Sequence, residues 1–393
     1  MLIEIHMLKN YPPVNLNRDD SGAPKTCFFG GVQRGRISSQ CLKRSWRTSE
    51  IFKSLNGNGI RTRCMPEKVR DRLMSENIDE SYAKAAAEVL VDFGKSKKRN
   101  QEENKGDNQD KKSTKELRTQ IIMYSQEEWK QIIDAVSQYV KKYMEGSPSP
   151  KTKDFQADVQ EWLNGQNFGD KKPVSIDIAL FGRMVTSSAL VDVNASMQVA
   201  HAISTHAVNR ESDYFTAVDD LNENREEQDS GAGMIGDVDY NSCCYYEYAS
   251  VDVDLLKANL ANASNREELV EKLIPTLLRA MAYTNPSGKQ NTFAGQVVPD
   301  VVLVECKAEK IPLSYVNAFE EPVSTWGGSH VVECSVKKLT DHVNLMDESY
   351  ELPVLHRAFF APRFANLAPD KGEAYSKFSE LTAACVGWLQ EEK

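Results

Sequence analysis

Apolar residues recur along this chain with two periods, and the change from one period to the other separates strands from helices. Residues 2–8 alternate apolar side chains around Glu4 and His6, a pattern typical of a strand. Further on, Leu42 and Trp46 are four residues apart and therefore share one face of a predicted helix. The same reasoning predicts strands over residues 174–185, 243–254 and 299–307 and a helix over 264–283.

In chain order these elements read strand, helix, strand, strand, helix, strand. That order is the ferredoxin-like arrangement of RNA-recognition domains, so we expect an α+β fold. Pro275 lies inside the second helix and predicts a kink or a break, and Gly182 inside the second strand predicts a bulge. The connection between the two middle strands spans about 55 residues, which is too long for a hairpin and indicates a functional segment. Residues 311–323 and 331–338 read as extended.

Residues 56–173 read as a helical insertion after the first helix. Ser125 is followed three residues later by Glu128, a capping box that predicts a helix start. Residues 95–115 are polar and of low complexity, so we expect a mobile loop. The insertion is predicted to contain helices that begin at Pro66 and Ser125 and helices over residues 78–93 and 155–163.

Charge is distributed unevenly along the chain. Residues 21–49 hold six cations and no acid, although the 393-residue chain carries a net charge of −9. Clustered cations in an acidic protein indicate one local polyanionic partner, because consecutive phosphates require clustered positive charge. Ser38 or Ser39 can cap the predicted helix, whose free N–H groups add a phosphate site. The alternative is a solvated basic helix face.

Composition bounds the class of protein. No apolar run approaches the ~18 residues that a membrane span requires, and the charged first segment is a strand rather than a signal peptide. The eight cysteines show no CxxC spacing, which favours reduced thiols over a disulfide framework or a zinc site. We therefore expect a cytoplasmic protein with no membrane partner, no metal and no cofactor.

Three patterns point to chemistry, and each has a simpler interpretation. Residues 231–236 satisfy GxGxxG, but a predicted strand follows where a dinucleotide site requires a helix. His201 and His206 are five residues apart, which favours packed or hydrogen-bonded histidines over a zinc pair. The aspartate pairs at 19–20 and 219–220 could hold metals for phosphodiester cleavage, although capping of a turn explains the first pair better. No catalytic residue is predicted.

Aromatic residues in the long connection stand among polar neighbours. Tyr214 and Phe215 could wedge between nucleic-acid bases or, alternatively, fasten the loop to its own domain. Tyr245, Tyr246 and Tyr248 on the following strand could stack on RNA, but one face of that sheet is buried, so core packing is the better interpretation.

Nine short segments stand in one order between residues 15 and 319. They are NLNRDD (15–20), GAPK (22–25), FGG (29–31), RISSQCLKR (36–44), DIALFGRM (177–184), AHAISTH (200–206), DYFTAVDDL (213–221), KQNTFA (289–294) and PLSYVNAF (312–319). Taken together, they closely resemble the CasC family, the repeated backbone subunit of the type I-E CRISPR Cascade complex.

The resemblance implies an RNA-recognition-like palm, a helical fingers insertion and a thumb made by the long connection. The expected palm comprises residues 1–55, a strand at 174–190, and residues 241–393 with a C-terminal extension. The fingers are residues 56–173, and the thumb is residues 191–240. Copies would polymerise head to tail along a CRISPR RNA, each thumb pushing one nucleotide out. The guide would read target DNA by base pairing, while the protein reads backbone and shape.

The basic stretch and the resemblance together assign a set of contacts. Met184 and Phe215 would flank the displaced base, with Thr216 beside it. Lysines of the fingers resemble a patch that guides target DNA, namely Lys111, Lys112 and Lys115. The expected RNA-binding residues are Arg18, Lys25, Arg36, Ser38, Ser39, Gln40, Lys43, Arg44, Arg47, Arg183, Met184, Phe215 and Thr216.

Three functional hypotheses follow. The first is a non-enzymatic RNA-binding backbone subunit in antiviral defence, whose partners are CRISPR RNA, target DNA, copies of itself and other Cascade subunits. The second is a metal-dependent ribonuclease of a CRISPR effector complex. The third is a nucleotide-dependent enzyme at residues 231–236. The first agrees with both the local polyanion site and the family resemblance.

Overall fold

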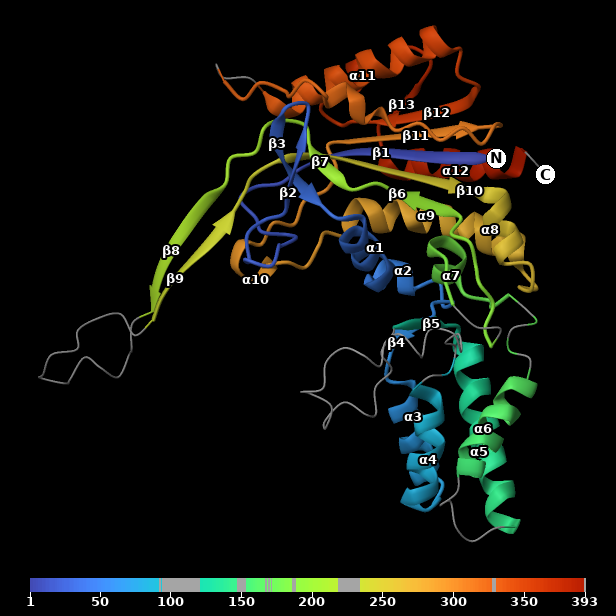
Figure 1. Ribbon diagram of the computed structural model, residues 1–393. Helices are drawn as coiled ribbons and strands as arrows, with labels where there is room; N and C mark the ends of the chain where they lie inside the picture. Colours follow the sequence, from blue (N-terminus) through green and yellow to red (C-terminus); the bar gives the residue numbers. More distant parts are fainter. Residues whose placement is uncertain are drawn as a thin grey trace, which may run out of the picture. The chain divides into compact units, whose positions relative to one another are not determined.

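The chain folds into two compact units (Figure 1). Unit 1 comprises Met1–Ser54, Gln198–Val253 and Glu271–Lys393, and unit 2 comprises Leu55–Met197 and Asp254–Val270. The structure is a computed structural model that describes residues 1–391 except 92, 94–120, 147–152, 167, 169, 171, 186–188, 218–233 and 327–329. The polar loop expected at 95–115 therefore lies outside the described residues.

Unit 1 is built on one long sheet with the strand order β13-β12-β11-β1-β10-β7-β3-β2, and β6 pairs with β10 beside this path. The strands predicted at 2–8, 243–254 and 299–307 are confirmed as β1, β10 and β11. The strands of the sheet are β1 (Leu2–Asn10), β2 (Thr26–Phe29), β3 (Val32–Ile37), β6 (Met197–Val199), β7 (Ala202–Ser204), β10 (Cys244–Asp252), β11 (Val301–Lys307), β12 (Val354–Phe360) and β13 (Glu373–Tyr375).

Strand β1 lies inside the sheet because it pairs antiparallel with β10 on one side and with β11 on the other. Both faces of the sheet are covered, so every residue of β1 except Asn10 is buried. On one face Tyr246 and Leu303 belong to a core that includes α11 (Val331–Tyr350). Helix α12 (Phe378–Glu391) lies on the other face (Figure 1). Its Trp388 stacks on His356 of β12, with ring centroids 5.4 Å apart.

The tyrosines of β10 are buried, as the sequence predicted, Tyr246 and Tyr248 in this core and Tyr245 against Tyr11. Tyr245, Tyr246 and Tyr248 are each less than 10% exposed. All three phenol groups have polar partners, since Tyr245 donates to Asn241, Tyr246 hydrogen-bonds His6 and Tyr248 donates to Glu4. Aromatic rings with satisfied hydroxyl groups are typical of a core that also contains polar side chains.

Charged side chains form a buried network under α11. Arg357 of β12 donates to both carboxylate oxygens of Asp347 on α11, at 2.6 and 2.9 Å, and to Glu305 of β11 at 2.7 Å. Lys307 pairs with Glu4, and no side chain of the network is more than 6% exposed. Burial disfavours the charged guanidinium, but the two carboxylates outweigh it and raise the pKa of Arg357. The network therefore ties β11, β12 and α11 together.

The extended segments predicted after the fourth strand were wrong. Residues Tyr315–Phe319 form a 3₁₀-helix (η4), and the apolar residues from Val331 onward belong to α11. Val336, Leu339 and Val343 lie on its buried face at helical spacing. The segment over 331–338 is rich in β-branched valines, which favour strands, and eight residues are too few to reveal a helical period.

The helix predicted over residues 264–283 is confirmed as α9 (Arg266–Tyr283). It continues through Pro275 as one helix, so a break at this proline is wrong. Unit 1 also contains α1 (Ser39–Thr48), α2 (Glu50–Lys53), α10 (Gln290–Phe293) and the 3₁₀-helix η5 (Ala365–Leu367), and almost all of α8 (Val253–Asn259) lies in unit 2.

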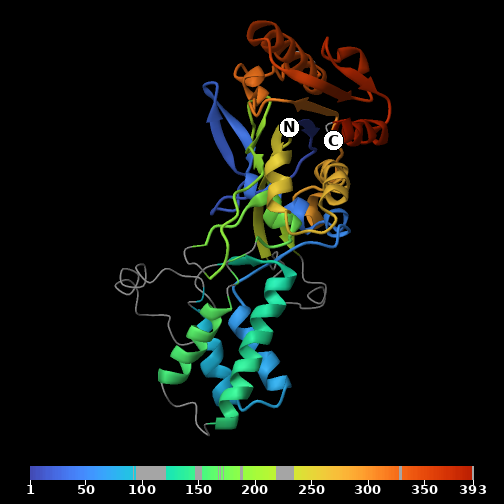
Figure 2. The ribbon, with the colours of Figure 1, turned by 90° about the vertical axis from the view of Figure 1, so that its right-hand side faces the viewer.

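Unit 2 is mainly helical, as predicted, and its long helices run side by side (Figure 2). Ser125 and Glu128 form the expected capping box at the start of α5, because each side chain accepts from the other residue's backbone N–H, at 2.8 and 3.1 Å. A short antiparallel pair, β4 with β5, was not predicted. The elements are β4 (Ile60–Thr62), α3 (Met65–Ser75), α4 (Glu80–Val91), β5 (Ile122–Tyr124), α5 (Gln126–Gly146), α6 (Lys153–Gly165) and α7 (Ile176–Phe181).

The strand predicted at 174–185, and assigned to the palm as 174–190, was wrong. Residues Ile176–Phe181 form helix α7 in unit 2. Asp177 accepts hydrogen bonds from the backbone of Gly59 and Ile178, and Gly182 ends the helix with φ of +77°. A short apolar run that is buried all round shows no period, so the pattern could not separate helix from strand.

Candidate nucleic-acid interface

The helix predicted beyond residue 38 is confirmed as α1, and its start is held by polar side chains. The Ser38 hydroxyl accepts from the Cys41 backbone N–H at 3.4 Å, which caps the helix. Asn17 accepts from the Ser38 backbone N–H at 2.9 Å, so the loop before β2 holds the cap in place. Leu42 and Trp46 are buried, as their spacing predicted.

The loop over residues 15–25 is shaped by two further polar side chains. Asn15 is fully buried and donates to the carbonyls of Gly22 and Asp239, at 2.9 and 2.8 Å. Asp19 accepts from the backbone N–H groups of Ser21 and Ala23, so it caps a turn, as expected. The hydrogen bond from the Ser21 hydroxyl lowers the pKa of Asp19 most strongly.

Cations of the basic stretch gather around the start of α1. Burial raises the pKa of the Cys41 thiol, and the nearby charges of Lys25 and Arg44 oppose this rise. Burial also lowers the pKa of Lys43. Arg18, Gln40 and Arg44 are exposed, while Lys25, Arg36, Lys43 and Arg47 are half-buried and Ser38 and Ser39 are buried. Lys25 and Arg44 both act on Cys41, and Lys25 and Arg36 both act on His201, so these three cations of loop, strand and helix form one basic surface.

Arg34 does not belong to that surface, although it lies in the same basic stretch. Its guanidinium is fully buried and donates to the backbone carbonyls of Phe29, Ser204, Phe319 and Glu320, at 2.8 to 3.2 Å. These bonds hold the turn between β2 and β3 against η4.

The same turn requires glycine. Gly30 has φ of +59°, and a Cβ there would lie 1.7 Å from the carbonyl oxygen of Glu320. Gly30 therefore serves a close backbone contact inside unit 1, and Gly31, with φ of +77°, completes the turn.

Arg36 is held by two acceptors at the edge of the basic surface. Its Nε–H donates to the Thr26 carbonyl at 3.3 Å, and Nη1 lies 3.1 Å from Nδ1 of His201. Burial and the charges of Arg36 and Lys25 lower the pKa of His201. His206 is buried, and its Nε2 accepts from the Cys244 backbone N–H at 3.2 Å. The expectation of hydrogen-bonded histidines is confirmed for both.

The long connection forms an antiparallel ribbon of two strands, β8 (Glu211–Ala217) and β9 (Met234–Tyr240), and all seven residues of β8 are exposed (Figure 1). Phe215 is 38% exposed and lies over Gly236, where an added Cβ would approach its ring to 2.6 Å. Tyr214 is opposite Asp237 on the other face and is 65% exposed.

Residues 231–236 hold no helix start within the described part. Gly236 lies inside β9, so a strand is present where a dinucleotide site requires a helix, as expected. Gly231 and Gly233 lie outside the described residues, as do Asp219 and Asp220.

The expectation that Arg183 binds RNA is not supported by its surroundings in unit 2. Its guanidinium is buried, donates to both carboxylate oxygens of Glu128 at 2.7 and 2.9 Å, and also donates to the carbonyls of Met123 and Val191. Arg183 therefore fastens the segment after α7 to the start of α5. The next residue, Met184, is 87% exposed and remains available for a partner.

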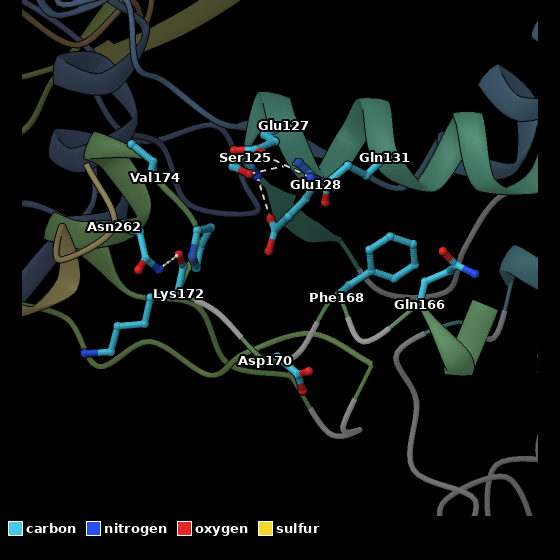
Figure 3. A pocket seen from close by; sticks show the side chains of 11 residues that line it. Ser125, Glu127, Glu128, Gln131, Gln166, Phe168, Asp170, Lys172, Val174 and Asn262 are labelled. Carbon is cyan, nitrogen blue, oxygen red and sulfur yellow. Dashed lines mark hydrogen bonds between the residues drawn. The ribbon is translucent and has the colours of Figure 1, made fainter. Parts of the chain in front are cut away.

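A cavity of about 550 Å³ opens beside the start of α5 (Figure 3). Figure 3 shows Ser125 and Glu128 joined by hydrogen bonds on one side and Lys172 joined to Asn262 on the other. The lining of the cavity has more carboxylates than cations, which disfavours the binding of phosphate groups. It is lined by Ser125, Glu127, Glu128, Gln131, Gln166, Phe168, Asp170, Lys172, Pro173, Val174 and Asn262.

The remaining predicted sites can be located only where they fall within the described residues. Lys111, Lys112 and Lys115 lie outside the described residues. Within the described ranges, no three His, Cys, Asp or Glu residues gather where they could hold a metal ion. In the same ranges, no helix combines the length and the apolar character needed to cross a membrane.

Sequence reasoning missed the residues that hold the basic surface in place. Asn15, Asn17 and Arg34 hydrogen-bond backbone groups that are distant in the sequence. His201 contacts Arg36 from the segment between β6 and β7. Asn15 and Asn17 stand just before Arg18, and asparagines in such a position are typical of a turn. Their distant partners leave no signal in the sequence.

Comparison with solved structures shows which class of structures this chain resembles. A solved chain titled "CRISPR RNA-guided surveillance complex, pre-nicking" matches with a TM-score of 0.76 and 26% identity, covering 99% of this chain and 100% of that chain. A second, titled "CRISPR RNA-guided surveillance complex", matches with a TM-score of 0.70 and 22% identity over the same shares. No curated protein sequence matches the chain.

Comparison of the sequence with known families then shows the family of the chain. Residues 3–384 match the family described as CT1975-like protein, so the chain belongs to that family. The membership expected from the resemblance to CasC is confirmed.

Proposed function

We propose that this chain is a CRISPR RNA-binding backbone subunit of a type I-E Cascade surveillance complex. The observation that carries the proposal is the basic surface at the capped start of α1, in a chain that a surveillance-complex structure matches over its full length. Cations beside free helix N–H groups suit a phosphate backbone and carry no base specificity. Sequence readout then belongs to the guide, which pairs with target DNA.

The sheet of unit 1 supports an RNA-recognition-like palm. Strands β11, β1, β10 and β7 are neighbours in the order fourth, first, third, second, and they pair antiparallel. Helix α1 lies in the connection from β1 to β7, and α9 lies in the connection from β10 to β11. This is the ferredoxin-like order, with β7 as the second strand in place of the strand predicted over residues 174–185.

The same proposal assigns the other parts of the chain. The helices of unit 2 are the fingers, and the β8–β9 ribbon is the thumb. Open head-to-tail contacts between copies would generate a filament, whose length the RNA and capping subunits must limit. The proposed RNA contacts exclude Arg183 and are Arg18, Lys25, Arg36, Ser38, Ser39, Gln40, Lys43, Arg44, Arg47, Met184, Phe215 and Thr216. Lys111, Lys112 and Lys115 are proposed to guide target DNA.

We propose no catalytic role. The ribonuclease hypothesis invoked the aspartate pairs at 19–20 and 219–220, of which the second lies outside the described residues. The Asp19 carboxylate accepts three hydrogen bonds from Ser21 and Ala23 within its own turn. The subunit would act in the cytoplasm, where guide and target meet.

Co-expression with a CRISPR array tests the proposal. We expect the purified protein to carry RNA of a defined length and to assemble into particles whose mass rises with the length of the guide. Size-exclusion chromatography with light scattering and RNA sequencing measures both quantities. Protein that stays monomeric and free of CRISPR RNA at low ionic strength would contradict the proposal.

The thumb assignment predicts that Phe215→Ala abolishes the unstacking of guide nucleotides. Phe215 lies on one face of the ribbon, and a base–aromatic contact contributes about 1–3 kcal/mol. The measurement is the fluorescence of 2-aminopurine placed at successive guide positions, which rises where a base leaves the stack. Tyr214→Ala is the matched control, because neighbouring strand residues point to opposite faces. Equal losses in both variants would contradict the assignment.

A further inference from the structure

Arg36 sits at the edge of the basic surface in a geometry that its neighbours impose. In the β3–β7 pairing Arg36 lies opposite Ile203, and His201 is the residue that immediately precedes β7. The contact joins Nη1 of Arg36 to Nδ1 of His201 at 3.1 Å, and the Thr26 carbonyl accepts from Nε. Two acceptors on different segments therefore orient one guanidinium plane.

The direction of that hydrogen bond determines the protonation of the imidazole. A guanidinium only donates, so Nδ1 of His201 must carry a lone pair and the ring proton must be on Nε2. The ring is therefore neutral in this geometry. Burial and the charges of Arg36 and Lys25 also lower the pKa of His201, in agreement with a neutral ring.

His201 itself is exposed, so its role is not that of a core residue. Arg36 has five N–H donors, and within the described residues two of them are used by Thr26 and His201. The others can meet the two oxygens of a phosphate in the forked geometry that arginine favours. Because two acceptors already hold the guanidinium, its remaining N–H groups stay oriented toward a phosphate, and binding costs no further side-chain conformational entropy.

We infer that His201 is a positioning residue for guide binding: its neutral ring accepts from Arg36 and aims the guanidinium at a backbone phosphate. The inference rests on the proposed function and adds to it a residue that makes no phosphate contact of its own. Since His201 is neutral, removing it leaves the number of positive charges unchanged. Its effect on RNA binding must therefore pass through Arg36.

Fluorescence anisotropy with a labelled guide RNA, repeated over a series of KCl concentrations with the full chain, tests the inference. Each phosphate contact on a single strand contributes about 0.7 to the slope of log K against log salt. We expect His201→Ala to reduce the magnitude of this slope by about 0.7, as Arg36→Ala does. The double variant should match Arg36→Ala alone, and His201→Gln, whose amide oxygen can accept, should retain the wild-type slope.

Several outcomes would overturn the inference. They are a wild-type slope in His201→Ala, additive losses in the double variant, or a His201→Gln variant that behaves like His201→Ala. Melting temperatures of all variants show whether folding is intact, and the Gln variant keeps the test valid should the Ala variant unfold. A wild-type chain that binds no guide would overturn the proposed function as well, whereas guide binding with an unchanged His201→Ala slope overturns this inference alone.

Discussion

Replacing Arg357 with methionine is expected to lower the free energy of unfolding by roughly 3–5 kcal/mol. Arg357 is the shared partner of Asp347 and Glu305, and all three side chains are almost completely buried. Methionine fills a similar volume but leaves Asp347 without its cation and Glu305 with only Lys307, 3.6 Å away, in a low-dielectric core. The two carboxylates must then stay charged with weaker pairing or take up protons, and either choice disfavours the folded state.

Urea denaturation followed by circular dichroism measures this effect. The matched control is Arg363→Met, which removes an exposed arginine paired with Asp300 at the surface and is expected to change stability by about 0–1 kcal/mol. Similar losses in the two variants would contradict the proposed importance of the buried network. A double replacement of Arg357 and Asp347 by apolar residues should recover part of the loss, because it removes an unpaired charge.

The second large effect concerns guide binding by α1. Replacing Lys43 and Arg47 together with alanine is expected to lower the slope of log K against log salt by about 1.4, two single-strand contacts at about 0.7 each. Each hydrogen bond to a charged group contributes about 1.5–3 kcal/mol, so affinity at low salt should fall by about 10² or more. The loss should be the same for every RNA sequence, because phosphate contacts carry no base information.

Filter binding or anisotropy over a range of KCl concentrations checks this prediction. The control is Lys371→Ala with Lys377→Ala, which removes the same charge from two exposed positions near the C-terminus. If both double variants reduce the slope equally, net charge rather than the surface at α1 governs binding. An unchanged slope in the α1 variant would contradict the assignment of guide phosphates to this helix.

The local elements of the candidate site were predictable because their signals are local. Ser38, Leu42 and Trp46 define the start and the buried face of α1 within nine residues, and the structure agrees. The capping box of Ser125 and Glu128 is equally short. In both cases the residues that make the contact are the residues that carry the pattern.

Predictions failed where a segment has no distinct face. Helix α7 is buried along almost its whole length, so its apolar run showed neither a helical nor a strand period. The valines at the start of α11 favour strands by their branching, yet they belong to a 20-residue helix whose period only a longer window reveals.

The amino-acid sequence by itself determined the chain's family, the central strands and helices, and the presence of one basic stretch over residues 21–49. Only the tertiary structure decided which cations of that stretch face solvent. Arg34 cannot be told from Arg36 or Arg44 by residue type, but its guanidinium is enclosed by the carbonyls of Ser204, Phe319 and Glu320, far along the chain. Outside that stretch, Arg183 is held in the same way by a carboxylate 55 residues away. Burial and partner choice depend on segments that meet only after folding, and no local pattern encodes them.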